Sequence, residues 1–150
     1  MTGPVICGIE DASGAAVADV ARELAARYEV PLLYLHVLDG AGEMEQAARM
    51  LHETTAGTGE LAIERGPHPA DWLVDVATER GASFLVVGNH GPRSSLLGSI
   101  SADVSRRAPC PVIVVPPAAE SPASEAGGDE PEVDGGILRF RAGTGVRQVA

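Results

Sequence analysis

Short apolar runs alternate with amphipathic stretches along the first 116 residues of the chain. The apolar runs are rich in β-branched residues and flanked by turn formers, which predicts buried strands near residues 5–9, 32–38, 61–65, 84–87 and 111–115. Between them, apolar residues recur at helical spacing, which predicts helices near residues 13–28, 43–53, 69–80 and 99–107. This alternation predicts an α/β fold: a doubly wound, Rossmann-like, five-stranded parallel sheet with helices on both faces.

The composition changes after Pro116. Residues 117–136 are rich in alanine, serine, proline, glycine and acidic residues and hold almost no large apolar ones, so they cannot bury enough surface to become ordered. Ile137 to Arg141 alternates apolar and polar residues, which fits a strand that docks on the sheet, a peptide that pairs with another protein, or a disordered tail. We therefore predict a domain over 1–116, an acidic flexible linker over 117–136 and a short C-terminal segment over 137–150.

Charge and hydropathy exclude several classes of partner. The 150 residues carry a formal net charge of −10, and all eleven basic residues are arginine. This acidity argues against binding to nucleic acid or to an anionic membrane surface, and the lack of lysine excludes a Walker-type ATP loop. The apolar runs are too short to span a membrane, and the N-terminus does not resemble a secretory signal, so a cytoplasmic protein is expected.

The sequence predicts neither a metal centre nor a dedicated catalytic centre. Cys7 and Cys110 are too few for a disulfide framework and lie beside apolar runs, which favours small buried side chains. His36 is interpreted as a hydrogen-bonded histidine near a strand end, because no cluster of histidine, cysteine and acid at ligand spacing supports a metal. Ser99 has only His90 nearby in the sequence, so the chain is not expected to be an enzyme beyond slow ATP hydrolysis.

The strongest candidate for a binding element follows the fourth predicted strand. That strand ends at Gly88, a polar loop containing Gly91 follows, and Gly98 and Ser99 open a helix. The first turn of a helix presents free N–H groups and a partial positive charge, which suits a phosphate. Glycine lets the main chain approach a ligand closely. The pattern therefore predicts a candidate phosphate loop.

Two acidic residues follow the first predicted strand. Glu10 and Asp11 come directly after Ile9, at the end where ligands bind in open parallel sheets. Either one of these carboxylates hydrogen-bonds a ligand, or the pair stabilises the start of the next helix through the helix dipole. The pattern leaves both interpretations open.

Taken together, these motifs resemble the universal stress protein family over about residues 3–117. The most specific ones lie in the second half of the domain: Val86-Val87-Gly88-x-x-Gly91, Gly98-Ser99-Ile100 and the run from Arg106 to Val115. Three further matches are Gly8-Ile9-Glu10, His36-Val37 and the glycine and proline before the third helix. The resemblance implies an adenine nucleotide alpha hydrolase-like fold and a homodimer joined through the last strand, Val112, Ile113, Val114 and Val115.

The resemblance also implies a ligand, ATP or AMP with Mg²⁺ as an accompanying ion. Ile9 and Glu10 stand where the family contacts the adenosine part, and Val37 stands where the second strand offers main-chain atoms to adenine. Around the ribose and the phosphates, the resemblance implies Gly88, Gly91, Gly98, Ser99 and Ile100.

Two departures distinguish this chain from the family's ATP binders. The loop between Gly91 and Gly98 is shorter than usual, and Glu10 replaces an aspartate. Arg93 is the single cation of this loop and is either a phosphate ligand or a solvated surface residue. Two hypotheses follow: an adenine-nucleotide-binding regulatory protein of the stress response, or a nucleotide-free dimerisation and interaction module of the same fold.

Overall fold

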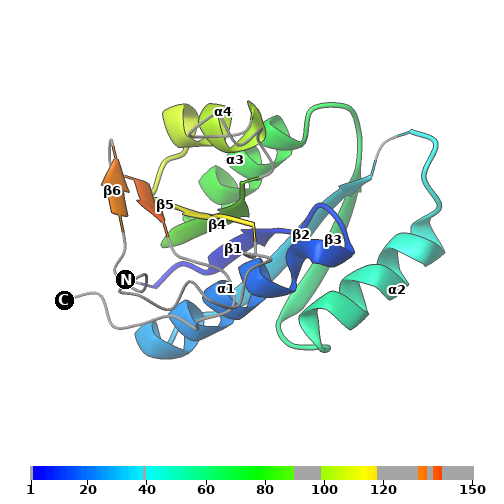
Figure 1. Ribbon diagram of the computed structural model, residues 1–150, viewed down its shortest axis with the longest axis horizontal. Helices are drawn as coiled ribbons and strands as arrows, with labels where there is room; N and C mark the ends of the chain where they lie inside the picture. The colour runs from blue at the N-terminus through cyan, green and yellow to red at the C-terminus, as the bar shows by residue number, and fades with distance from the viewer. Residues whose placement is uncertain (1, 39, 90–98, 118–131, 135–136, 140–150) are drawn as a thin grey trace, which may run out of the picture.

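Five parallel strands form the centre of the fold in the order β3-β2-β1-β4-β5 (Figure 1). The structure is a computed structural model that describes residues 2–38, 40–89, 99–117, 132–134 and 137–139. The strands are β1 (Val5–Gly8), β2 (Leu32–Leu38), β3 (Glu60–Arg65), β4 (Phe84–Gly88) and β5 (Val112–Val115). The predicted five-stranded parallel sheet is confirmed.

The order of the strands reverses between β1 and β4. β1 pairs with β2 on one side and with β4 on the other. The chain therefore winds outward from β1 through β2 to β3, and then crosses back to β4 and outward to β5. In open parallel sheets a crevice forms beyond the carboxyl ends of the strands at such a switch point.

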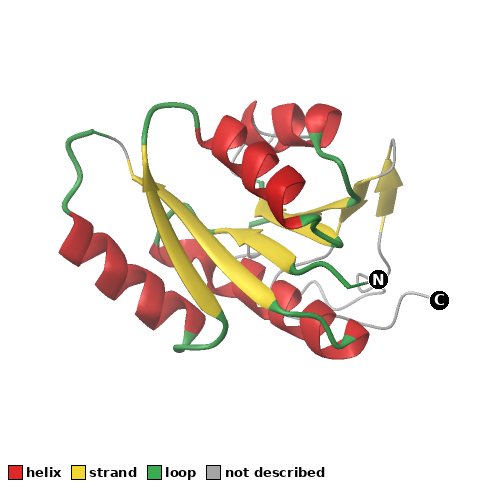
Figure 2. Cartoon of the chain, turned by 180° about the vertical axis from the view of Figure 1, so that it is seen from behind, coloured by secondary structure: helices red, strands yellow, loops and turns green. Residues whose placement is uncertain are grey.

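Two α-helices of the described chain cover each face of the sheet (Figures 1 and 2). On one face lie α1 (Ala15–Tyr28) and α2 (Met44–Thr55), and on the other lie α3 (Pro69–Arg80) and α4 (Ser99–Arg107). The end of α3 follows its sequence signal, because Gly81 adopts the left-handed conformation (φ 60°) that suits glycine after a helix. None of the helices in the described ranges is long and apolar enough to cross a bilayer.

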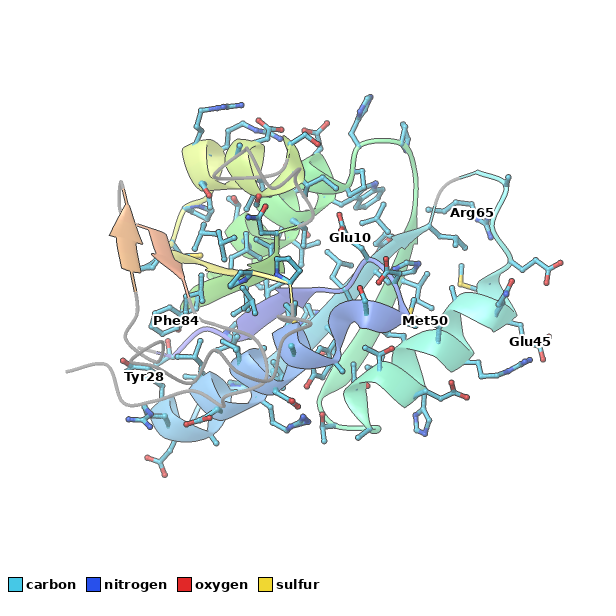
Figure 3. All side chains as sticks on the ribbon, in the orientation of Figure 1. Glu10, Tyr28, Glu45, Met50, Arg65 and Phe84 are labelled. Carbon is cyan, nitrogen blue, oxygen red and sulfur yellow. The ribbon has the colours of Figure 1, made fainter. Side chains whose placement is uncertain are left out.

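Buried side chains alternate between the two faces, as the period of a strand requires. Val5 and Cys7 of β1 pack with α1, whereas Ile6 packs with α3 and α4. Near the amino ends of the strands, Tyr28 of α1 meets Phe84 of β4, with ring centroids 5.2 Å apart (Figure 3). The sheet is thus held between two aliphatic layers.

Asp11 begins the first helical segment. Its side chain accepts a hydrogen bond from the main-chain N–H of Ser13 at 2.8 Å and caps a short 3-10 helix (Ala12–Gly14) that leads into α1. This is the side-chain capping that aspartate favours before a helix. For Asp11, the helix-entry interpretation is therefore confirmed.

Two short strands near the C-terminus extend the sheet beyond β5. β7 (Ile137–Arg139) pairs in parallel with β5, and β6 (Glu132–Asp134) pairs antiparallel with β7. β6 falls in the range predicted as a linker, and β7 in the segment for which docking on the sheet was one interpretation. The edge of β5 that was predicted to pair with a second copy is paired with β7 of the same chain instead.

Candidate functional site

A pocket of about 370 Å³ lies beyond the carboxyl ends of β1, β2 and β4. This is the place where the strand order reverses, and the volume falls in the range of small-molecule sites. Its walls come from the strand ends, the loop after β2, and helices α3 and α4. The lining residues are Gly8, Ile9, Glu10, Leu35, His36, Val37, Leu38, Gly42, Pro69, Leu73, Val87, Gly88 and Ile100.

The end of β1 is held to β2 by two hydrogen bonds. The main-chain N–H of Ile9 donates to the main-chain oxygen of Leu35 at 3.0 Å. The Nδ1 atom of His36 lies 2.7 Å from the main-chain oxygen of Ile9. Because a carbonyl oxygen can only accept, Nδ1 carries the proton. These bonds fix the backbone from which the Glu10 side chain leaves (Figure 3).

The loop between β2 and α2 forms the outer wall. Nη1 of Arg65, at the end of β3, donates to the main-chain oxygen of Gly42 at 3.1 Å and lies 3.4 Å from that of Gly40. Figure 3 shows the Arg65 side chain beside this loop. A Cβ atom on Gly42 would lie 2.3 Å from Cδ1 of Leu38, so the loop packs directly on Leu38. An alanine at this position would force the Leu38 side chain to move.

The opposite wall comes from α3 and α4, through Pro69, Leu73 and Ile100. Pro69 occupies the first turn of α3, where its missing N–H costs nothing. A Cβ atom on Gly8 would lie 3.0 Å from Cδ2 of Leu73, so α3 approaches β1 very closely at the base of the pocket. This wall is apolar, which suits the flat face of an aromatic ring.

A second cavity of about 320 Å³ adjoins the first and shares Pro69 and Ile100 with it. It lies at the N-termini of α3 and α4, and its remaining lining residues are His68, Ala70, Asp71, Ser99 and Asp103. The first N–H groups of a helix have no partner within the helix, and the helix dipole makes this end attractive to anions. The combined cavities therefore run from an apolar pocket to two helix N-termini.

Two carboxylates border the second cavity and share one guanidinium. Arg107 Nη2 lies 2.7 Å from Asp71 Oδ1 and 2.7 Å from Asp103 Oδ2, and so joins α3 to α4. Hydrogen bonding to Arg107 lowers the pKa of Asp103 below its usual range, with a smaller contribution from Arg106. Asp103 is thus ionised at neutral pH, and both carboxylates are paired with Arg107.

The structure brings together most of the residues that the sequence singled out. Ile9, Glu10, Val37, Gly88 and Ile100 line the first pocket. Ser99 is the first residue of α4, as predicted, and lines the second cavity. The other three predicted residues, Gly91, Arg93 and Gly98, lie outside the described residues.

Other pocket residues were not predicted. His36 was interpreted as a structural histidine, and its hydrogen bond to Ile9 agrees with that, but His36 also lines the pocket. Gly42 and Leu73 carried no site signal, because the first lies in a loop and the second belongs to a regular helical stripe. The glycine and proline before α3 were the only pattern pointing toward Pro69.

The described residues hold no group of three or more histidine, cysteine, aspartate or glutamate side chains that could bind a metal ion. Cys7 is fully buried, and burial raises the pKa of its thiol. A thiol in this environment stays protonated and is a poor metal ligand or nucleophile.

A doubly wound parallel sheet with a pocket at its switch point defines the α/β proteins that bind ligands beyond the strand ends. A sequence model described as the universal stress protein family matches residues 1–116. The chain belongs to the universal stress protein family.

Known relatives agree with this assignment. A universal stress protein of Mycolicibacterium smegmatis is 35% identical over 137 residues, which covers 76% of this chain and 46% of the relative. This chain spans about half the length of the curated relatives it matches. The universal stress protein of Archaeoglobus fulgidus superimposes with a TM-score of 0.59 at 25% identity, covering 76% of this chain and 98% of that one. The structure of the Archaeoglobus fulgidus protein in complex with dAMP superimposes with a TM-score of 0.57 at 25% identity. The match covers 75% of this chain and 96% of that one.

Proposed function

We propose that this chain binds an adenine nucleotide in the pocket beyond β1, β2 and β4, and acts as a regulatory protein of the stress response. One observation carries the proposal: the apolar pocket that holds five of the predicted residues adjoins a cavity at the N-terminus of α4. An adenosine needs an apolar slot with a few polar groups, and its phosphate needs free N–H groups. The first cavity offers the apolar slot, and the second cavity offers the N–H groups at the start of α4.

The proposed pose follows from the two walls. The adenine ring lies between the β2 end, at Val37 and Leu38, and the apolar wall of α3. Glu10 contacts the ribose hydroxyls, since a carboxylate is a pure hydrogen-bond acceptor. Gly88 and Ile100 border the ribose and the first phosphate, and Ser99 offers its hydroxyl and the first N–H groups of α4.

Among adenine nucleotides we propose a monophosphate such as AMP as the main ligand. The Archaeoglobus fulgidus relative is described in complex with dAMP, a nucleoside monophosphate. The loop between Gly91 and Gly98 is short, and Asp71 and Asp103 border the cavity that additional phosphates would enter. Carboxylates repel phosphates at short range. ATP, with Mg²⁺ to offset its charge, is the weaker ligand in this proposal.

The test is direct binding. The purified chain is denatured, the released small molecules are separated by chromatography, and AMP and ATP–Mg²⁺ are then titrated by calorimetry. We expect AMP to bind with micromolar affinity, and Ser99→Ala to weaken it about three- to tenfold through the lost hydrogen bond. Ser105→Ala, on the same helix but outside both cavities, is the control and should bind as the wild type does.

The second candidate function is a nucleotide-free interaction module. It is favoured by the same Asp71 and Asp103 carboxylates, which place negative charge where a phosphate would have to sit. No released nucleotide and no binding at millimolar AMP or ATP would support this candidate and refute the first. A cytoplasmic location and a slow ATP hydrolysis remain predictions from the sequence.

A further inference from the structure

The outer edge of β5 is the surface with the clearest consequence beyond ligand binding. We propose that the β6–β7 hairpin is an intramolecular cap on this edge, and that it competes with a second copy of the chain for the same main-chain groups. The full chain is then a monomer, and release of the hairpin makes it a dimer. This inference does not depend on nucleotide binding.

The register of the strands shows that the edge is occupied. Val112, Ile113 and Val114 of β5 stand opposite Ile137, Leu138 and Arg139 of β7. On the other side, β5 pairs with β4 from Leu85 to Gly88. A strand has two edges, and both edges of β5 are therefore paired within one chain. A second copy can reach these groups only if β7 leaves.

A dimer through β5 would need the groups that β7 uses. Two identical strands related by a two-fold axis pair antiparallel, with the same residues exposed from each copy. β5 is short, Val112–Val115, and β7 covers all of it except Val115. Capped and paired forms of β5 therefore exclude each other.

The hairpin replaces a self-complementary edge with one that resists pairing. Its outer strand β6 is only three residues long, and two of them, Glu132 and Asp134, are acidic. Short and charged edge strands are a common protection against pairing between molecules. An antiparallel pair of two β6 strands would bring acidic residues together, in a chain whose net charge is already −10. The capped molecule thus lacks a favourable strand partner in its own copies.

The test uses the full chain with prolines in β7. Successive residues of a strand direct their N–H groups to opposite neighbours, and proline has no N–H and is excluded from a strand paired on both sides. Ile137→Pro combined with Leu138→Pro removes one N–H on each side of β7 and should therefore release the hairpin while leaving the domain intact, as circular dichroism would verify. Ala142→Pro, beyond β7, is the matched control. Sedimentation equilibrium from micromolar to millimolar concentration gives the mass of each form.

We expect the wild type and the control to have the monomer mass, and the double variant to approach twice that mass as its concentration rises. A synthetic peptide of residues 130–141, added in excess, should return the double variant to the monomer, whereas a scrambled peptide should not. Two results would overturn the proposal: a wild type that is already a dimer, or a folded double variant that stays monomeric throughout.

Amide hydrogen exchange is the second measurement, and it stands even if the variant is unstable. In the dilute wild-type chain, the outward amides of Val112 to Val114 should exchange slowly because β7 covers them. Rapid exchange of all outward β5 amides in the monomeric wild type would show that the edge is open and would refute the cap.

Discussion

The Nδ1 atom of His36 lies 2.7 Å from the main-chain oxygen of Ile9, so a side chain of β2 holds the end of β1 beside the pocket. His36 is only 7% exposed, and the Nδ1 proton is its donor to that oxygen. Ile9 itself is 2% exposed and precedes Glu10, the proposed ribose ligand. The bond therefore fixes a strand end on which ligand geometry depends.

Replacement of His36 should destabilise the domain. In His36→Phe the Ile9 oxygen loses its partner in a buried place, which costs about 1–3 kcal/mol. For a domain of this size that lowers the melting temperature by about 2–4 °C per kcal/mol. His52→Phe, on the exposed face of α2, is the control and should melt with the wild type. Equal stability of both variants would mean that the His36 bond contributes nothing.

Arg65 should position the outer wall of the pocket. Its bonds to the Gly40 and Gly42 oxygens are charge-assisted but exposed, so Arg65→Ala should weaken AMP binding only about fivefold. Affinity for ribose 5-phosphate, which lacks the base, should not change, and neither should the melting temperature. The control is Arg49→Ala, an exposed arginine of α2 whose ion pair with Glu45 lies on the helix surface.

The prediction for Arg65 rests on the proposed nucleotide site. Different results would refute the nucleotide proposal and the positioning role of Arg65. Wild-type protein that binds no AMP refutes the nucleotide proposal. Wild-type protein that binds AMP, together with an Arg65→Ala variant of equal affinity, refutes only the positioning role. An equal loss for AMP and ribose 5-phosphate would indicate a general structural defect.

Alanine substitutions at two glycines of the loop between β2 and α2 should have different effects on stability. A Cβ atom on Gly42 would lie 2.3 Å from the Leu38 side chain, whereas one on Gly40 would meet nothing within 4 Å. Gly42→Ala should displace Leu38 toward the pocket and cost about 1–3 kcal/mol, as overpacking does. Gly40→Ala should be neutral. Thermal melts and AMP titrations of both variants measure this, and similar values for the two would contradict the packing described.

The Asp103–Arg107 ion pair should stabilise the domain above a defined pH. Arg107 depresses the pKa of Asp103 below its ordinary value of 3.8, so the contribution is present above that pH. It is lost as the pH falls through the lower pKa of the folded state. The difference in melting temperature between wild type and Asp103→Asn should therefore shrink below about pH 4. Asp75→Asn, on α3 and outside this ion pair, is the control variant.

Periodic signals predicted the parts of the fold that depend on neighbours in sequence. The stop of α3 at Gly81 follows from local cap chemistry, and α4 begins at Ser99, where the sequence predicted it. The alternation of Val5 and Ile6 between the two layers follows from the period of a strand. These features need only the residues around them, so the sequence alone was sufficient.

Contacts between distant residues could not be predicted in this way. The bond from His36 reaches back 27 residues, and that from Arg65 reaches back 23 residues to Gly42. Neither contact leaves a period or a spacing in the sequence. The pairing of β7 with β5 was one of three interpretations of an alternating segment, because alternation shows that a strand can form and does not show which edge it meets.

The burial of Cys7 has a practical consequence. This thiol lies on β1, between β2 and β4, whereas the other cysteine, Cys110, is partly accessible. A maleimide or disulfide reagent would modify Cys110 in the intact molecule and would reach Cys7 only when the central strands separate. The rate at which Cys7 is modified therefore measures how often the whole domain opens.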